Sequence, residues 1–292
     1  MGLYMTGILY LVGTPIGNLG DFSPRAIETL EKVDFIAAED TRVTIKLLNR
    51  FNIKKPMISY FEHNKFKRGE EILARLESEE SCALVTDAGM PAISDPGEDL
   101  VALCASHGVP VVVIPGPCAV VSALALSGLF TGRFCFEGFL EVGKKIRLEH
   151  LKAVCDEQRT LIFYEAPHKL RATLRDMLEN FGDRRISLVR EMTKIHEEVF
   201  RTTLSAAVDF YSQNDPRGEF VLVIEGKSAL SASEDTAAEQ DADDGVDSIV
   251  KAEKLVGQYI AEGMTRPEAV KLAVKETGVS RSDLYKQTAS HH

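Results

Sequence analysis

The chain has 292 residues, a length typical of two domains, and 45% of them are hydrophobic, which is enough to fill ordinary cores. The formal net charge of −10 argues against non-specific nucleic-acid binding by the whole surface, although a local basic patch remains compatible with it. The five cysteines form no CxxC pair, which indicates free thiols in a reducing cytosol. No signal peptide precedes the first strand, whose apolar run is too short to span a bilayer, so we expect a cytoplasmic protein without a membrane partner.

Apolar runs and helical patterns alternate from the N-terminus to about residue 128. After a first strand at 8–12, a helix is expected to begin at Ser23 and Pro24, because Ser is a good N-cap and Pro suits the first turn. Thr41 is expected to cap the next helix. The remaining pattern predicts strands at 34–40, 57–60, 83–85 and 109–114, the last of them buried, and helices at 67–76, 100–107 and 119–126. This alternation predicts an α/β domain with a mainly parallel sheet over residues 1–128.

The second half of the chain has its own set of alternating elements. The pattern predicts helices at 144–154, 168–181 and 205–211, and strands at 133–140, 160–165, 186–191, 197–203 and 220–225. The strand at 197–203 is expected at an edge. We therefore expect a second α/β domain over residues 129–226, with a sheet of its own.

The C-terminal part changes character again. Residues 227–247 are acidic and lack apolar periodicity, which predicts a flexible linker. Residues 248–290 read as a small helical unit, in which capping boxes at Thr265–Glu268 and Ser280–Asp283 predict a helix-turn-helix shape. Its basic residues would suit phosphate contacts, and a purely structural packing unit is the alternative: Arg266, Lys271, Lys275, Arg281 and Lys286.

The richest stretch is Cys82–Gly97, CALVTDAGMPAISDPG, in which a buried strand ends abruptly at Asp87 in a loop of small and rigid residues. In open α/β sheets, ligands bind outside the carboxyl ends of the strands, where this loop lies. Glycine permits close backbone approach, proline fixes the loop, and a carboxylate accepts hydrogen bonds from ribose hydroxyls or an ammonium group. A second such loop, Pro115–Ala119, strengthens the prediction of a ligand site over an ordinary β–α connection.

Several other kinds of site are excluded by spacing. The glycines at 13, 17 and 20 give GxxxGxxG and not the dinucleotide fingerprint, and no Gly-Lys-Ser/Thr follows to make a P-loop. The histidines show no metal-binding spacing, so we expect no metal site, and no Gly-x-Ser-x-Gly elbow is present. What remains is a set of acids, prolines and glycines at strand ends, which suits a polar organic cofactor better than hydrolytic chemistry.

Seven motifs taken in order carry a family resemblance: TPIGNLGD, AAEDTR, TDAGMPAISDPG, IPGPCA, FCFEGFL, FYEAPHKL and GEFVLVIEG. From about Ile8 to Gly226 the chain resembles the bacterial 16S rRNA (cytidine-2′-O)-methyltransferases, a branch of the tetrapyrrole methylase superfamily. The resemblance implies two α/β domains that hold S-adenosylmethionine in the cleft between them, usually in a homodimer. It also implies 2′-O-methylation of a cytidine in 16S rRNA, with the 30S subunit as partner.

Carried onto this sequence, the resemblance implies cofactor-binding residues in both domains: Asp87, Ala88, Gly89, Met90, Pro91, Ala92, Ile93, Pro115, Gly116, Pro117, Cys118, Ala119, Tyr164, Glu191, Met192 and Gly218. Members usually have Thr where this chain has Met90, so a hydroxyl contact there is missing. Because a ribose hydroxyl is a poor nucleophile, a base should assist, and the candidates are Glu39, Asp40 and Glu165. Arg42 or Lys194 would hold a phosphate, although each of these groups could instead serve as a cap or ion pair.

The substrate is less firmly implied than the cofactor, because relatives in the superfamily methylate tetrapyrroles or a modified histidine. Three basic clusters favour RNA, with solvated helix faces as the alternative: Lys65-Phe66-Lys67-Arg68, Lys144-Lys145-Ile146-Arg147 and Arg184-Arg185. A tetrapyrrole methyltransferase and a non-catalytic ribosome-assembly module therefore remain open as alternatives.

Overall fold

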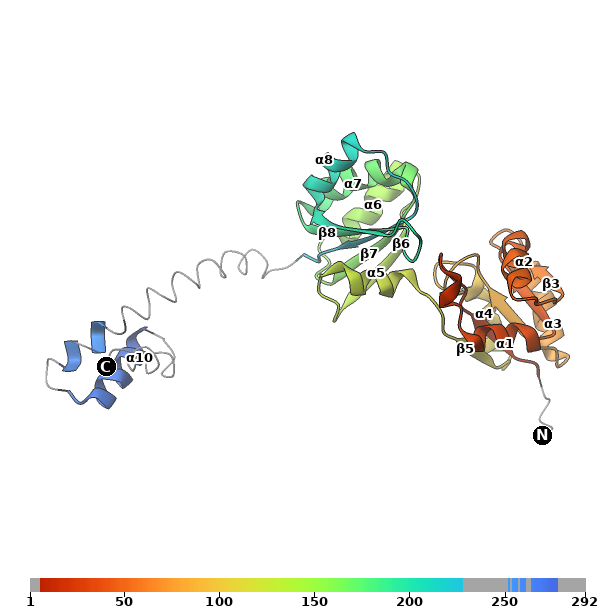
Figure 1. Cartoon of the computed structure of the whole chain (residues 1–292), viewed down its shortest axis with the longest axis horizontal. Helices are drawn as coiled ribbons and strands as arrows, with labels where there is room; N and C mark the ends of the chain where they lie inside the picture. The colour runs from red at the N-terminus through yellow and green to blue at the C-terminus, as the bar shows by residue number, and fades with distance from the viewer. Residues whose placement is uncertain (1–5, 228–251, 253, 257, 261–263, 278–292) are drawn as a thin grey trace. The chain divides into compact units, whose positions relative to one another are not determined.

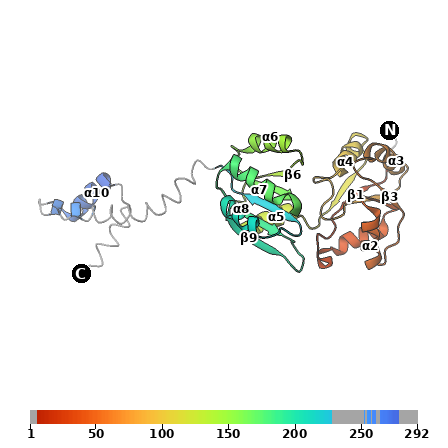
Figure 2. The same cartoon turned by 90° about the horizontal axis from the view of Figure 1, so that it is seen from above.

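The computed structural model describes residues 6–227, 252, 254–256, 258–260 and 264–277 (Figures 1 and 2). The chain divides into two compact units, residues 1–227 and 228–292. The predicted linker beyond Lys227 and the predicted capping box at 280–283 lie outside the described residues. Within the described part, no helix combines the length and the apolar character needed to cross a membrane.

The first half of unit 1 is a five-stranded parallel sheet, in the order β3-β2-β4-β1-β5. Its strands are β1 (Leu9–Val12), β2 (Phe35–Ala38), β3 (Met57–Ser59), β4 (Cys82–Val85) and β5 (Val111–Ile114). The connections carry the short 3-10 helix η1 (Leu19–Asp21) and the helices α1 (Pro24–Lys32), α2 (Thr41–Arg50), α3 (Lys65–Glu77) and α4 (Gly97–Ser106). The predicted α/β arrangement with a parallel sheet is therefore confirmed.

Helices cover both faces of this sheet, which explains why its central strands read as continuous apolar runs. Successive strand residues point to opposite faces, so Phe35 and Ala37 join the core under α3 and α4, while Ile36 and Ala38 join the core under α1 and α2. Ser23 caps α1 as predicted, since its hydroxyl accepts a hydrogen bond from the Ala26 amide at 3.1 Å.

Two local predictions for the first half were wrong. The strand at 109–114 was expected to be buried, but β5 is the edge strand next to β1 and leaves Val113 47% exposed. Thr41 was expected to cap α2, but the cap is Asp40, whose carboxylate accepts from the Arg42 amide at 2.8 Å. A β-branched run occurs in edge strands as well as in buried ones, and Asp is as good an N-cap as Thr. Residue type alone therefore does not decide either case.

The second half of unit 1 is a mixed five-stranded sheet, in the order β6-β7-β10-β8-β9. Its strands are β6 (Phe134–Phe139), β7 (Thr160–Glu165), β8 (Arg185–Arg190), β9 (Glu198–Thr203) and β10 (Phe220–Ile224). The β6–β7 pair is parallel, and the other pairs are antiparallel. The last strand, β10, lies at the centre, and β9 lies at an edge as predicted.

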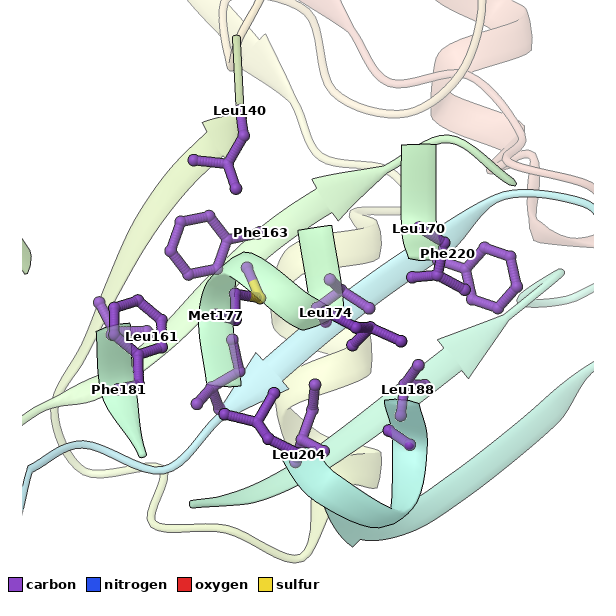
Figure 3. Close-up of a cluster of buried hydrophobic side chains, with 14 of the residues drawn as sticks. Leu140, Leu161, Phe163, Leu170, Leu174, Met177, Phe181, Leu188, Leu204 and Phe220 are labelled. Atoms are coloured by element: carbon purple, nitrogen blue, oxygen red, sulfur yellow. The ribbon is translucent and has the colours of Figure 1, made fainter. Parts of the chain in front are cut away.

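Helices also cover both faces of the second sheet. On one face, α6 (Lys144–Val154), α7 (Pro167–Phe181) and α8 (Leu204–Gln213) bury the cluster drawn in Figure 3, which includes Phe163, Leu174 and Met177. On the other face lies α5 (Ala119–Ser127), whose Val120 and Leu124 pack with residues of β7, β8 and β10. The division into domains 1–128 and 129–226 remains a prediction, and α5, which precedes residue 128, packs on the second sheet.

The described part of unit 2 is helical. Helix α10 (Arg266–Thr277) contributes Ala269, Val270 and Ala273 to a small core shared with Ala252 and Val256. One of the two bonds of the predicted capping box is present at its start, where the Thr265 amide donates to the Glu268 carboxylate at 3.2 Å. The Thr265 hydroxyl donates to the same carboxylate, and the bond lowers the pKa of Glu268.

Candidate active site

Unit 1 contains a cavity of about 610 Å³ at the carboxyl ends of the strands of the first sheet. Residues of both sheets and their loops line it, which agrees with the predicted cleft between two α/β halves. The sequence-predicted residues that it brings together are Glu39, Asp87, Ala88, Gly89, Met90, Ile93, Cys118, Ala119, Tyr164, Glu165, Met192 and Lys194.

The loop between β4 and α4 forms one wall of the cavity and is held by Asp95. Its carboxylate accepts hydrogen bonds from the backbone amides of Ala92, at 2.9 Å, and Gly97, at 2.7 Å. Burial nonetheless raises the pKa of Asp95. Ala92 and Ser94 have φ values of 65° and 60°, which non-glycine residues seldom adopt. Such strain is characteristic of functional loops that the surrounding structure holds in place.

The first loop of the chain is fastened to this wall. The backbone of Thr14 exchanges two hydrogen bonds with that of Gly89, at 2.9 and 3.2 Å, and Gly89 has a φ of 88° that favours glycine. Gly13 approaches Gly116 so closely that a Cβ atom on Gly13 would lie 2.7 Å from the Cα atom of Gly116. The loops after β1, β4 and β5 therefore form one connected rim.

Two carboxylates lie close to each other at this rim, Asp87 after β4 and Glu39 after the neighbouring strand β2. Glu39, which follows β2, accepts from the Thr86 hydroxyl at 2.6 Å and from the Asp87 amide at 3.4 Å, both through Oε2. Its other oxygen, Oε1, accepts no hydrogen bond from the described residues. Partial burial, and next the negative charge of Glu39, raise the pKa of Asp87. The rim therefore offers carboxylate oxygens to a ligand in the cavity.

Asp40, a candidate base, and Arg42, predicted to hold a phosphate in catalysis, do not line the cavity. The Arg42 guanidinium and amide hold the Asp40 carboxylate, and the side-chain bonds lower the pKa of Asp40 to about 2. Asp40 therefore acts as the cap of α2 and as the partner of Arg42. These two residues therefore match the alternative to a catalytic role, in which they serve as a helix cap and an ion pair.

Glu165 reaches the cavity from the end of β7 but is 2% exposed. Its carboxylate accepts from the Thr173 hydroxyl and from the Ala166 amide, the latter at 2.8 Å, and Lys169 Nζ lies 3.6 Å away. Both oxygens are thus engaged by the second half of the unit. Beside it, burial raises the pKa of Tyr164 to about 12, so this phenol stays protonated.

Lys194 lies on the segment between β8 and β9 and lines the cavity with Met192. Its ammonium group donates to Glu191 at 2.8 Å and to Glu219 at 3.0 Å. The hydrogen bond from Lys194 lowers the pKa of Glu191, and despite partial burial the pKa of Lys194 is raised. The predicted phosphate-binding lysine is therefore already paired with two carboxylates.

Several predicted cofactor residues do not line the cavity: Pro91, Ala92, Pro115, Gly116, Pro117, Glu191 and Gly218. Residues outside the predicted set also line it: Ile16, Thr86, Ser94, Asp95, Phe139, Ala166, Pro167, Val189, Glu219, Phe220 and Val221. The residues from β8 and β10 carried no signal in the sequence, because their place depends on antiparallel pairing between distant segments. Among the described residues, no group of three His, Cys, Asp or Glu side chains is placed to hold a metal ion.

Comparison with known proteins connects this site to a family. The model of the tetrapyrrole (corrin/porphyrin) methylases matches residues 8–208. Ribosomal RNA small subunit methyltransferase I of Synechocystis sp. is 47% identical over 280 residues, which is 96% of each chain. The protein of the same name from Bacillus subtilis is 44% identical and covers 96% of this chain and 93% of its own length. The Thermotoga maritima protein of that name is 49% identical over 221 residues, 76% of this chain and 99% of its own length.

Solved structures show the same fold at low identity. Diphthine synthase matches with a TM-score of 0.60 at 15% identity, over 76% of this chain and 91% of its own. Uroporphyrin-III C-methyltransferase from Thermus thermophilus, solved with S-adenosyl homocysteine, matches with a TM-score of 0.54 at 17% identity, over 75% and 97%. The chain therefore belongs to the tetrapyrrole methylase family and, within it, to the ribosomal RNA small subunit methyltransferases I.

Proposed function

We propose that this protein transfers the methyl group of S-adenosylmethionine to the 2′-hydroxyl of a cytidine in the 16S rRNA of the small ribosomal subunit. The observation that carries the proposal is the 44–49% identity with small-subunit rRNA methyltransferases of three bacteria. Tetrapyrrole methyltransferases match at 18% identity, which supports a shared fold and not a shared substrate.

The residues around the cavity fit S-adenosylmethionine. The carboxylates of Glu39 and Asp87 suit ribose hydroxyls or the ammonium group, while Ile16, Met90 and Ala119 supply apolar surface for a flat base. The sulfur of Met90 accepts from the Gly116 amide at 3.2 Å, so this side chain links the two glycine-rich loops where a hydroxyl is usual. S-adenosylmethionine, when bound, supplies an electrophilic methyl group on a sulfonium.

Replacing Asp87 with asparagine is expected to weaken S-adenosylmethionine binding roughly 10- to 100-fold, because a charged hydrogen-bond acceptor is lost. Since the pKa of Asp87 is raised, the affinity of the wild type should fall as the pH drops through that pKa, at a higher pH than for an ordinary aspartate. The nearby groups that also shape this profile are Glu39, Asp40 and Arg42. Calorimetry across pH 4–8 measures the affinity for S-adenosylmethionine. Equal affinities of wild type and Asp87→Asn at every pH would contradict the assignment of Asp87 to the cofactor site.

The protein's part in the reaction is to position the ribose hydroxyl and to remove its proton. Methyl transfer is an in-line displacement, in which positioning of the two reactants supplies much of the rate. Among the three predicted bases, Glu39 suits proton removal best, because it lines the cavity with Oε1 available. Glu165 is buried with both oxygens engaged, and we assign it a positioning role beside Tyr164 and Lys169.

Several side chains of the predicted basic clusters are already engaged within unit 1. Lys65 pairs with Glu62 and Asp99, Arg68 with Glu71, and Arg147 with the buried Asp176. Arg184 donates to backbone carbonyls, and Arg185 pairs with Glu225. Affinity for RNA therefore rests less on these clusters than the sequence suggests. In unit 2, by contrast, Lys271 and Lys275 are exposed on α10.

A chain that ends at Lys227 is expected to keep its affinity for S-adenosylmethionine and its turnover number. The T. maritima relative supports this expectation, because 99% of its length matches 221 residues of this chain, which is close to the size of unit 1. The KM for small subunits should rise, by up to roughly tenfold, because the truncated chain lacks the phosphate contacts of unit 2. Salt weakens such contacts in the full-length protein, so the difference in KM between the two chains should shrink as salt is added. Loss of cofactor binding on truncation would contradict this division of roles, and so would an unchanged KM at low salt.

We further propose that the protein works as a homodimer and in the cytoplasm, where bacterial small subunits are assembled. Sedimentation at assay concentrations tests the proposed homodimer, since a fully active monomer would contradict it.

The proposed reaction itself is tested by transfer of labelled methyl groups to small subunits from cells that lack the endogenous activity. Label on uroporphyrinogen, with none on small subunits, would favour a tetrapyrrole substrate instead.

A further inference from the structure

A β-bulge in β6 brings an aromatic residue to the cavity. The pairing of β6 with β7 shifts its register between Phe136 and Gly138, and Gly138 has a φ of 66°. Bulges often re-aim a side chain near a functional site. A Cβ atom on Gly138 would lie 3.0 Å from the Ser94 hydroxyl, so β6 meets the strained loop after β4 at this point. The next residue, Phe139, lines the cavity.

The ring of Phe139 is anchored from the protein side and still largely open. Its centroid lies 5.2 Å from that of Tyr164 at an interplanar angle of 52°, and Lys169 Nζ lies 5.8 Å from it. Lys169 is itself fixed, because it donates to the Leu140 carbonyl at 3.2 Å. Phe139 nevertheless remains 55% exposed, and Ile93, which lines the same cavity, is 49% exposed. Burial of a phenylalanine side chain stabilises a fold, and the exposed ring of Phe139 does not contribute that stabilisation.

We propose that Phe139 is the platform on which the base of the target cytidine stacks, with Ile93 as an apolar neighbour in the same cavity. This inference rests on the proposed function. Sequence-specific RNA recognition mostly targets single-stranded nucleotides, whose unstacked bases proteins commonly hold on aromatic rings. Most of the predicted cofactor residues lie on the loops after β4 and β5, whereas Phe139 comes from the second sheet, where its ring packs on Tyr164. The platform therefore sets where the ribose lies, and Phe139 is a substrate-binding residue.

The test compares Phe139→Ala, Phe139→Leu and Phe139→Trp in the full-length protein. Loss of one stacked base should lower kcat/KM for small subunits roughly 5- to 100-fold in Phe139→Ala. Phe139→Leu should lose most of the same factor, because it keeps apolar volume but no aromatic face, and Phe139→Trp should stay within a few-fold of the wild type. The affinity for S-adenosylmethionine, measured by calorimetry, should change less than about threefold in all three.

Phe130→Ala is the matched control, because Phe130 is 69% exposed and does not line this cavity. It should leave kcat/KM unchanged, and thermal unfolding of each variant identifies a loss caused by misfolding. A kcat/KM of Phe139→Ala equal to the wild-type value would overturn the inference, as would a fall that Phe139→Leu fully restores or a matching loss of cofactor affinity. If the wild type itself fails to methylate small subunits, the proposed function fails first, and the two failures are thereby distinguished.

Discussion

Replacing Glu39 with glutamine is expected to lower kcat for methyl transfer roughly 100- to 10,000-fold, the usual contribution of a general base. Glutamine keeps the shape of the side chain and can still accept from the Thr86 hydroxyl, but it cannot take the proton of a ribose hydroxyl. The loss should appear in single-turnover rates at saturating cofactor and substrate, so that binding and chemistry are separated.

Asp40→Asn is the matched control for this prediction. Asp40 is adjacent in sequence and also acidic, but it is held by Arg42 outside the cavity. Its replacement should leave the single-turnover rate within a few-fold of the wild-type rate. A Glu39→Gln rate within a few-fold of wild type would rule out Glu39 as the base. A large loss in Asp40→Asn with normal unfolding would move the role to Asp40.

Asp176→Ala is expected to reduce the free energy of unfolding by roughly 3–5 kcal/mol, because it leaves a buried arginine without its partner. The Arg147 guanidinium donates to Asp176 at 2.7 Å, and both side chains are at most 10% exposed. This pair joins α6 to α7 over the second sheet. Urea unfolding followed by circular dichroism measures the change.

Two further variants show whether the cause is the orphaned charge. Glu71→Ala breaks the exposed Arg68–Glu71 pair on α3 and should change stability by about 1 kcal/mol or less. The double variant Arg147→Met with Asp176→Leu should recover most of the stability lost in Asp176→Ala, because no unpaired charge remains. Equal losses in Asp176→Ala and Glu71→Ala, or no recovery in the double variant, would show that burial of the pair is not the source of the effect.

Local patterns in the sequence predicted most of the fold, because each helix and strand is encoded by nearby residues. Ser23 before Pro24 and Thr265 before Glu268 marked helix starts that the structure confirms. The exposure of Val113 could not be predicted, because a β-branched run looks the same in a central strand and at an edge. Strand order depends on pairing between distant segments, and β10 is placed centrally by such pairing.

For the candidate site, the sequence predicted the loops and not the pairing of charges within them. Asp87 and Glu39 were identifiable because polar residues that end parallel strands meet at one edge. The engagement of Arg42 by Asp40, and of Lys194 by Glu191 and Glu219, depends on side-chain geometry that spacing does not reveal. Phe139 was missed although a signal was present, because a glycine inside a strand pattern, here Gly138, indicates a β-bulge.

The most direct test of the proposed reaction is nucleoside mapping of 16S rRNA after incubation of the protein with labelled S-adenosylmethionine. The small subunits should come from cells that lack the endogenous activity, and the rRNA should be digested to nucleosides and resolved by mass spectrometry. The proposed reaction predicts label in 2′-O-methylcytidine and in no base-methylated nucleoside. Label in a base, or no label while cofactor binding is intact, would contradict it.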